Sequence, residues 1–533
     1  MDKYCCLTGK NPIFRAHFRY QMSATLKLKP WVFFPPVVIL VMTLAFGVTY
    51  SDPFLRLAER TKDGMLNQFG WLFSWSAFAF LILLGTAYVL PFGRTKIGGK
   101  AAVPILSKWR WFAITLCTTV ATGILFWGMA EPLHHLHRPP PALAIESGSS
   151  LAAVFSLATL HLHWSFTPYG VYTLAGLVFA LSYYNLHQPF SLTASLAPIS
   201  TKLAGNRLGK LIDVICLYAL VLGMSASLGT GMFAITGGLD LLMGWTKSAL
   251  LLAMIGFSIV FSFVFSAVSG LHRGIAILSD VNVKAFFGLA VFVLITGPTL
   301  DILSLGWESV QDYAVNFFPR SVNFGDRVDR EWEQDWTLFY LANWYAWAPV
   351  AALFLGRIAV GYTVRDFILF NLVFPSLFTI IWMSIFGGTS LTFDMQEGQS
   401  LFETMELKGE EIVMFQVLGS LPFGRVISLA TLVMVFISYV TAADSNVSAM
   451  SAISTHGISP NQPEAPLWVK LVWGSIIGIT AWLMVSTAGI EGIRILSVMG
   501  GFPALFLVIV VAVGLVKMIL TSGARRSDEE QPF

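Results

Sequence analysis

The sequence predicts an all-α polytopic membrane protein with about twelve transmembrane helices. Only 12% of its 533 residues are charged and 56% are hydrophobic, whereas soluble proteins have about 25% charged residues. Apolar runs of roughly 18 to 25 residues recur along the chain, and each is long enough to cross a hydrocarbon core of about 30 Å. The runs lack the alternation of a β-barrel, and a backbone in lipid must satisfy its own hydrogen bonds, so they are predicted to be helices.

The predicted spans cover most of the chain, with four sizeable loops between them. The spans are Trp31–Val48, Trp71–Leu90, Trp111–Ala130, Leu151–Tyr184, Leu211–Met243, Leu250–Val268, Phe286–Leu303, Trp336–Ile358, Phe367–Phe386, Val426–Met450, Trp468–Val485 and Ile495–Val516. The loops are Ser51–Gly70, His134–Ser150, Gly306–Asp335 and Thr392–Pro422. The first run follows a basic, polar segment and is too long for a signal-peptide core, so we expect it to be a retained span.

Positive charge in the short loops predicts the orientation in the membrane. Lys and Arg are concentrated in three segments that the alternation of spans places on the same side. These are the amino-terminal tail (Lys3, Lys10, Arg15, Arg19, Lys27 and Lys29), the loop between the second and third predicted spans (Arg94, Lys96, Lys100 and Lys108) and the carboxyl end (Arg525 and Arg526). The positive-inside rule therefore predicts a multi-pass protein of the inner (plasma) membrane with both termini cytoplasmic. Orientation and contact with anionic membrane lipid explain the net charge of +3, and no nucleic-acid partner is predicted.

The four cysteines do not form a disulfide framework. Cys5 and Cys6 lie in the basic tail, and Cys117 and Cys216 lie within predicted spans. We expect reduced thiols, with lipidation of the adjacent pair as the alternative.

Tryptophan and tyrosine occur inside spans and are not confined to the interfacial belts where such side chains usually lie. Trp344 and Trp347 are three residues apart, so a helix places them about 60° from one another, and Tyr340 extends the stripe. The fourth span contains a second group of aromatic residues, Trp164, Tyr169 and Tyr172. They lie around a helical turn that Pro168 is expected to loosen. Together the two groups predict an aromatic box.

An aromatic box suits a quaternary ammonium group, which has no N–H to donate and is held by charge and by ring quadrupoles. Each cation–π contact contributes roughly 0.5 to 2 kcal/mol, with the larger value where water is excluded. The alternative explanation is that mid-span aromatic side chains only fill gaps between helices.

Two segments resemble the broken helices that mark the sites of inverted-repeat transporters. One is the run of small and hydroxyl residues from Cys117 to Gly123 in the third span, and the other runs from Ala342 to Pro349 in the eighth. Five spans separate them, which is the distance expected of equivalent first helices in two repeats.

Several motifs resemble those of the betaine/carnitine/choline transporter family. They extend over nearly the whole chain: Lys29-Pro-Trp-Val-Phe-Phe-Pro-Pro36, Phe126-Trp-Gly-Met-Ala-Glu-Pro132, His163-Trp-Ser-Phe-Thr-Pro-Tyr169, Gly223-Met-Ser-Ala-Ser-Leu-Gly229, Trp336-Thr-Leu-Phe-Tyr340, Arg357 with Arg365, Ser384-Ile-Phe-Gly-Gly-Thr389 and Thr441-Ala-Ala-Asp-Ser445. The resemblance implies a LeuT-type core of two inverted five-helix repeats preceded by two extra helices, a homotrimer, and alternating-access transport of a small onium compound such as betaine, choline or carnitine.

The resemblance also divides the chain and locates the site. It implies a tail and two extra helices in residues 1–108, a first repeat in 109–305, an outer interfacial connector in 306–335, a second repeat in 336–519 and a cytoplasmic tail in 520–533. The predicted substrate site consists of Trp164, Tyr169, Tyr172, Tyr340, Asn343, Trp344 and Trp347. Many family members have a Trp where this chain has Asn343, so one wall of the box is smaller and polar.

The resemblance places ion coupling at Val120, Thr441 and Ala442. Sodium-driven members resemble Gly-Met-Gly-Ile-Gly in the third span, where this chain has Thr119-Val-Ala-Thr-Gly123, and they have paired hydroxyl groups where Ala442 follows Thr441. Because hard cations take oxygen ligands, the loss of a hydroxyl weakens a sodium site. A sodium ion is therefore the one possible cofactor. Proton coupling and substrate exchange are the alternatives to sodium coupling.

The remaining polar residues give weaker predictions. Glu131 and Asp444 are candidates for proton coupling, and the favoured alternative places Glu131 at the outer surface and Asp444 as a helix cap. The His134–His137 cluster could bind zinc in principle, but as a loop at the outer mouth without a nearby carboxylate or thiolate it is a weak site, so no metal site is predicted. No enzyme motif or repeated pore loop is evident, which leaves an amino-acid or amine transporter of the same fold as the alternative function.

Overall fold

The computed structural model describes residues 28–119, 123–200, 207–269, 272–322, 329–456 and 465–529. Within these ranges the regular secondary structure is helical, and two isolated β-bridges join Leu28 to Thr455 and Lys96 to Thr363. The all-α prediction is confirmed for this part of the chain.

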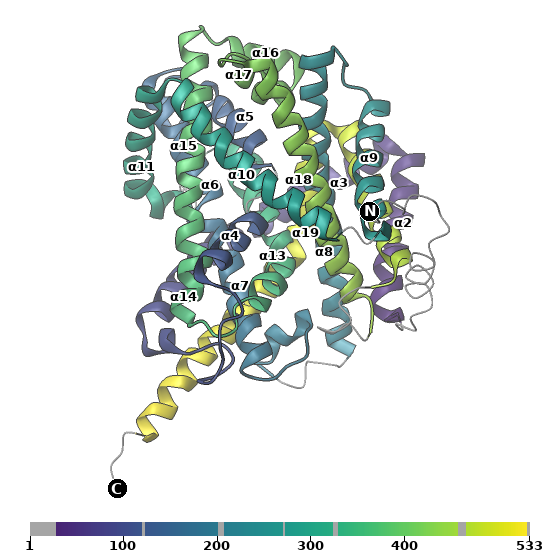
Figure 1. Ribbon diagram of the computed structural model, residues 1–533, viewed down its shortest axis with the longest axis vertical. Helices are drawn as coiled ribbons and strands as arrows, with labels where there is room; N and C mark the ends of the chain where they lie inside the picture. The colour runs from purple at the N-terminus through teal and green to yellow at the C-terminus, as the bar shows by residue number, and fades with distance from the viewer. Residues whose placement is uncertain are drawn as a thin grey trace, which may run out of the picture.

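The helices follow one another along the chain (Figure 1). They are α2 Pro30–Thr49, α3 Ser51–Val89, α4 Lys108–Thr119, α5 Ile124–His137, α6 Ser150–Trp164, α7 Phe166–Tyr184, α8 Arg207–Met243, α9 Ala249–Ser269, α10 His272–Thr296, α11 Thr299–Ser321, α12 Arg330–Glu333, α13 Phe339–Arg357, α14 Val364–Ile368, α15 Phe374–Gln396, α16 Ser400–Lys408, α17 Val413–Gly419, α18 Gly424–Ile453 and α19 Leu467–Glu529. Figure 1 shows α16 and α17 at the end of the molecule opposite the protruding end of α19.

Eight helical segments of the described chain are long and apolar enough to cross a membrane. They are Pro30–Thr49, Ser51–Val89, Leu208–Met243, Leu278–Thr296, Arg330–Arg357, Val364–Gln396, Gly424–Ile453 and Leu467–Thr521, and the shorter Ala249–Phe265 is also apolar. Large apolar side chains on their outer faces, such as Phe257, Phe261 and Phe265, are more than half exposed, as lipid contact requires. The chain is thus a multi-pass membrane protein, while the count of twelve spans stays a prediction.

The third and fourth predicted spans are each described as two helices. In the third, α4 is described to Thr119 and the described chain resumes at Gly123, just before α5 begins at Ile124. The middle of the predicted interruption, residues 120–122, lies outside the described residues, so this break stays a prediction. In the fourth, Ser165 has φ −115° and ψ −116° and separates α6 from α7. Pro168 contributes to this break because it has no N–H for the carbonyl of Trp164.

The predicted break in the eighth span is wrong. Helix α13 runs without interruption from Phe339 to Arg357 through Pro349, and the irregular segment is a π-helical turn at Gln334–Leu338, just before it. Packing against α7, α8 and α19 supports the helix on several sides, and such packing lets membrane helices tolerate an internal proline.

Three of the predicted loops contain helices. Ser51–Gly70 is the first half of α3, where Ala58, Lys62 and Leu66 form a buried stripe and Lys62 pairs with Glu491 of α19. The charges that suggested a loop therefore lie on a helix with one buried face.

The other two loops follow the same pattern. Most of the described part of 306–335 belongs to α11, which buries Ile302, Ser309 and Tyr313 and exposes Trp307. Residues 392–422 form the end of α15 together with α16 and α17. The fourth predicted loop, His134–Ser150, begins one helical turn later than predicted. Its first residues, up to His137, belong to α5.

The last two predicted spans are joined in α19. Gly489 interrupts that helix with φ 61° and ψ −136°, so the prediction of two separate apolar segments agrees with a sharp kink between them. Helix α13 lies in the middle of the bundle (Figure 1), where it contacts α7, α8 and α19, while α5, α6 and α15 pack against one another beside it.

Candidate functional site

Helix α13 carries most of the predicted site residues, and its two aromatic side chains have different neighbours. Trp344 is buried against α6 and α7. Trp347 is half-buried and lies near α8, where Gly223 permits the close approach: a Cβ at that position would be 3.5 Å from the indole Cδ1. The predicted single box is therefore divided between two faces of the helix.

Five of the predicted residues come together on the first face. The ring of Trp344 lies 5.6 Å from that of Trp164, 6.2 Å from that of Tyr169 and 5.2 Å from that of Tyr172, measured between centroids. Tyr340 completes the group at 5.2 Å from Trp164. We call these five side chains the Trp344 cluster; all are at most 5% exposed.

The break between α6 and α7 positions this cluster. It turns Trp164 at the end of α6 and Tyr169 and Tyr172 in the first turns of α7 toward the same helix. The indole Nε1 of Trp344 donates a 3.0 Å hydrogen bond to the backbone carbonyl of His163, and the Ser165 hydroxyl donates to the carbonyl of His161 at 2.6 Å. These side-chain bonds add to the backbone bonds at the break, where the Ser165 N–H donates to the carbonyl of His161 at 3.0 Å.

A small cavity lies on the second face of α13. Its walls include Trp347, Phe263, Tyr439, Ala442 and Ala443, and its volume is about 20 Å³, which is room for one water molecule. We call it the Trp347 cavity. It joins Trp347 to Ala442, two predicted site residues that are 95 positions apart in the sequence.

Asn343 lies on neither face. Its Oδ1 accepts a hydrogen bond from the Ser497 hydroxyl at 3.3 Å, which connects α13 to the second half of α19. The amide is half-buried, and its N–H groups remain able to donate further hydrogen bonds.

The predicted coupling residues are described only in part. Val120 lies outside the described residues. The Thr441 hydroxyl donates to the carbonyls of Ile437 and Ser438, both at 3.0 Å, so it is bound to its own helix. Asp444 is half-buried inside α18.

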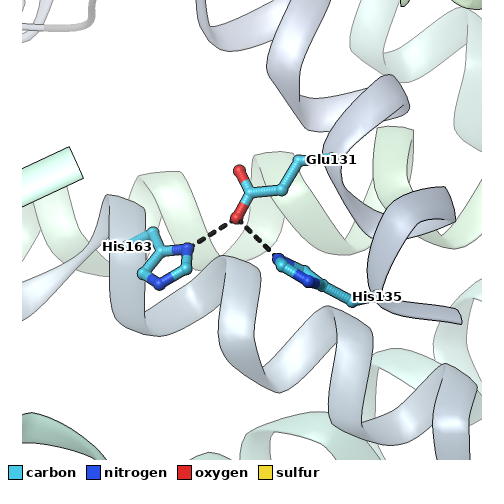
Figure 2. Close-up of side chains that lie close together, drawn as sticks. All are labelled: Glu131, His135 and His163. Carbon is cyan, nitrogen blue, oxygen red and sulfur yellow. Dashed lines mark hydrogen bonds and ion pairs between the residues drawn. The ribbon is translucent and has the colours of Figure 1, made fainter. Parts of the chain in front are cut away.

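A carboxylate and two imidazoles form a buried group beside the Trp344 cluster (Figure 2). Oε1 of Glu131 lies 2.6 Å from Nδ1 of His163 and 3.3 Å from Nε2 of His135, and its Oε2 accepts a 3.0 Å hydrogen bond from the indole of Trp164. Glu131 is completely buried. The expectation that it ends its span at the outer surface is therefore wrong.

Sequence reasoning did not find this group, although one signal was present. Glu131 and His135 are four residues apart, the spacing at which helical side chains meet, and His163 precedes the predicted site residue Trp164. The other histidines of the segment also lie beside carboxylates: His134 is 3.4 Å from Glu410 and His137 is 2.6 Å from Asp394. The argument that no carboxylate is close to these histidines is thus corrected.

Glu131, His135 and His163 are also the described residues best placed to hold a metal ion. Two ligands of one zinc ion at tetrahedral angles lie about 3.3 Å apart, whereas Oε1 of Glu131 and Nδ1 of His163 are separated by 2.6 Å. That separation is a hydrogen bond, so the observed geometry favours a hydrogen-bonded group over a metal centre.

A layer of charged and aromatic side chains lies next to this group. The Arg494 guanidinium stacks at 5.2 Å over Trp336, whose ring contacts His134 and His135 at 5.0 and 4.7 Å. Burial opposes ionisation of Glu410, yet the hydrogen bond and charge of His134 keep the pKa of that carboxyl below its ordinary value. This layer covers the group of Glu131, His135 and His163 on the side of Trp336.

Comparison with known proteins gives a consistent picture. The sequence model described as the betaine/carnitine/choline family transporter matches residues 31–524. An ectoine/hydroxyectoine transporter of Virgibacillus pantothenticus is 27% identical over 94% of this chain and 98% of its own length. A high-affinity choline transport protein of Escherichia coli is 28% identical over 94% and 73%. A glycine betaine/proline/choline/ectoine transporter of Vibrio parahaemolyticus is 30% identical over 86% and 81%.

Proposed function

Because the chain belongs to the betaine/carnitine/choline transporter family and is a transporter, not an enzyme, we propose that it carries a small quaternary-ammonium or sulfonium compound such as glycine betaine, choline or carnitine by secondary active transport. The observation that carries this proposal is the Trp344 cluster. Three aromatic rings contact the Trp344 indole, and Tyr340 joins them through Trp164, in a buried part of the bundle. Buried rings of this kind attract an onium head most strongly.

Alternating access gives the two faces of α13 separate parts in the transport cycle. The rings of Trp164, Tyr172 and Trp344 lie at packing distance from one another, so an onium head fits between them only when α13 and the α6–α7 break separate. The Trp347 cavity lies on the neighbouring face, about 60° around the helix from Trp344. We place the substrate between α13 and α7 in one half of the cycle and next to Trp347 in the other.

Assembly and location are part of the same proposal. The protein is proposed to be a homotrimer in the inner (plasma) membrane, with a LeuT-type repeat core and both termini in the cytoplasm. Native mass spectrometry of the purified protein would measure the assembly. Labelling of a cysteine added near residue 29 in intact and permeabilised cells would test the orientation.

Uptake into proteoliposomes tests the substrate class. Labelled glycine betaine, choline, carnitine and ectoine are offered with a sodium gradient, with a proton gradient, with neither, and in counterflow. We expect uptake of at least one onium compound, and the gradient that drives it identifies sodium coupling, proton coupling or exchange. A folded, reconstituted protein that carries no onium compound would refute the proposal.

Transport of an amino acid is the second candidate. The Vibrio parahaemolyticus relative is named for proline as well as for glycine betaine and choline, and Asn343 gives α13, the helix of Trp344 and Trp347, a hydrogen-bonding side chain. Labelled proline in the same assay separates the two: proline uptake that onium compounds do not inhibit would favour the second candidate.

A further inference from the structure

The buried Glu131 carboxylate has a role that the proposed transport function does not yet include. We propose that it is the fixed counter-charge of the substrate site, that it acts through the indole of Trp164, and that it biases the site toward ligands with a net positive charge, such as choline, over zwitterions with the same head group. This inference rests on the proposed function.

The hydrogen bonds around Glu131 favour its ionised form. Its oxygens lie within hydrogen-bonding distance of Nδ1 of His163, Nε2 of His135 and Nε1 of Trp164. Indole can only donate, and a carboxylate can only accept, so at least this bond has a fixed direction. His163 fits the same pattern, because with a proton on Nδ1 its Nε2 can accept from the Thr337 hydroxyl 3.0 Å away.

Arg494 is the cationic side chain of the layer beside this group; it lies over Trp336 and already pairs with Asp335 and Glu491. The described ion-pair partners of Glu131 are His135 and His163. We take both imidazoles as neutral, which gives the group a net charge of −1. An uncompensated buried charge is costly and calls for a partner. A ligand cation bound at the adjacent Trp344 cluster supplies one.

Trp164 connects the charge to the binding surface. Its Nε1 donates to Glu131 at 3.0 Å, while its ring lies 5.2 Å from Tyr340 and 5.6 Å from Trp344. A hydrogen bond to an anion polarises the donor group and makes the indole face more negative. Since the cation–π attraction depends on that negative face, the carboxylate strengthens the binding of a cation by Trp164.

The same arrangement distinguishes between onium ligands. The Trp344 cluster contains no Lys or Arg to pair with a ligand carboxylate, and Glu131 repels one. The Glu131 carboxylate therefore attracts the onium head of a zwitterion but repels its carboxylate tail. A ligand with a net positive charge is only attracted. Choline is expected to bind more tightly than glycine betaine.

Binding of three ligands to the Glu131→Gln variant tests the inference. The ligands are choline, glycine betaine and 3,3-dimethylbutanol, which is the neutral carbon analogue of choline and measures shape alone. Glutamine keeps the size of the side chain and an acceptor for Trp164 but removes the charge. We expect the variant to bind choline about tenfold more weakly, to lose less affinity for glycine betaine, and to bind the neutral analogue within about twofold of the wild type.

Glu406→Gln is the matched control, because it removes the same charge from α16, where Glu406 pairs with the exposed Arg138. It is expected to leave all three affinities unchanged. Equal losses for all three ligands in Glu131→Gln would show that the residue only maintains the structure and would overturn the inference. A wild-type protein that binds no onium ligand would instead refute the proposed transport function.

A second pair of variants serves if Glu131→Gln does not fold. Trp164→Phe and Trp344→Phe make the same chemical change, but only the Trp164 indole donates to the carboxylate; Trp344 donates to the carbonyl of His163. We expect Trp164→Phe to lose more of the discrimination between choline and 3,3-dimethylbutanol. Equal losses would contradict a link through Trp164.

Zinc titration of the wild-type protein in the absence of organic ligand examines the remaining alternative. Because the oxygen and nitrogen of the Glu131–His163 pair are in hydrogen-bond contact, we expect no stoichiometric binding. Tight binding of one Zn²⁺ per chain that Glu131→Gln abolishes would make the group a metal centre and overturn the counter-charge inference.

Discussion

The two faces of α13 use the same residue type in opposite ways. Trp344 lies in a dry cluster where its ring contacts three others and its N–H has a partner. Trp347, three residues later, borders a cavity of about 20 Å³ together with Ala442. The first face is fully packed and resists change, whereas the second has spare space next to the predicted ion-coupling residue. Helical spacing alone does not determine the environment of a side chain.

Removal of the Trp344 ring should have the largest effect. Trp344→Ala would open a cavity among the rings, and we expect a loss of about 3 to 5 kcal/mol in stability together with loss of measurable onium uptake. Thermal unfolding in detergent and counterflow measure the two effects separately. Trp109→Ala, at a tryptophan that is 73% exposed, is the control and should change neither.

Trp347→Ala should separate the two faces. Because Trp347 is half-buried and already borders a cavity, we expect a smaller stability loss than for Trp344→Ala and a roughly tenfold loss of transport affinity from one missing cation–π partner. The concentration dependence of uptake measures it. Unchanged uptake of all substrates would exclude Trp347 from the substrate path.

Ala442→Ser adds a hydroxyl after Thr441, as in the paired hydroxyl groups of sodium-driven family members. It tests whether residue 442, which borders the Trp347 cavity, lies at an ion-coupling site. An added oxygen ligand should increase the dependence of uptake on sodium by a few-fold, since hard cations take oxygen ligands. Ala443→Ser, which adds the same hydroxyl at the neighbouring position of the cavity wall, is the control. Equal sodium responses in the two variants would argue against a coupling site at 442.

The connection between the helices at Asn343 should contribute least. Asn343→Ala and Ser497→Ala each remove one 3.3 Å hydrogen bond, and we expect each to cost about 1 kcal/mol of stability. The double variant should cost no more than the larger single loss. Additive losses, measured by thermal unfolding, would show that the two side chains act independently.

The sequence predicted the features that depend on local composition. The absence of charge predicted the membrane helices, and the positions of Trp164, Tyr172 and Trp344 were sufficient to predict a cluster that the fold brings together. Each of these predictions depends on residues close together in the chain or on one kind of side chain.

Predictions failed where a distant partner decides the outcome. Ser51–Gly70 was predicted to be a loop, yet it is helical, and its Lys62 is buried against Glu491, 429 residues away. Glu131 seemed to end a span because Pro132 follows it, yet its partner His163 is 32 residues later on another helix. Pro349 suggested a break, but packing by three neighbouring helices supports α13 as one segment.

The kink at Gly489 limits which mutations the protein can tolerate. A Cβ at this position would meet no atom within 4 Å, yet the backbone has φ 61° and ψ −136°, a conformation that essentially only glycine adopts. Gly64 and Gly85 of α3 are equally uncrowded but have ordinary helical geometry. In a saturation screen scored by abundance in the membrane, alanine should be accepted at 64 and 85 and rejected at 489, where the constraint is conformational and the available volume is irrelevant.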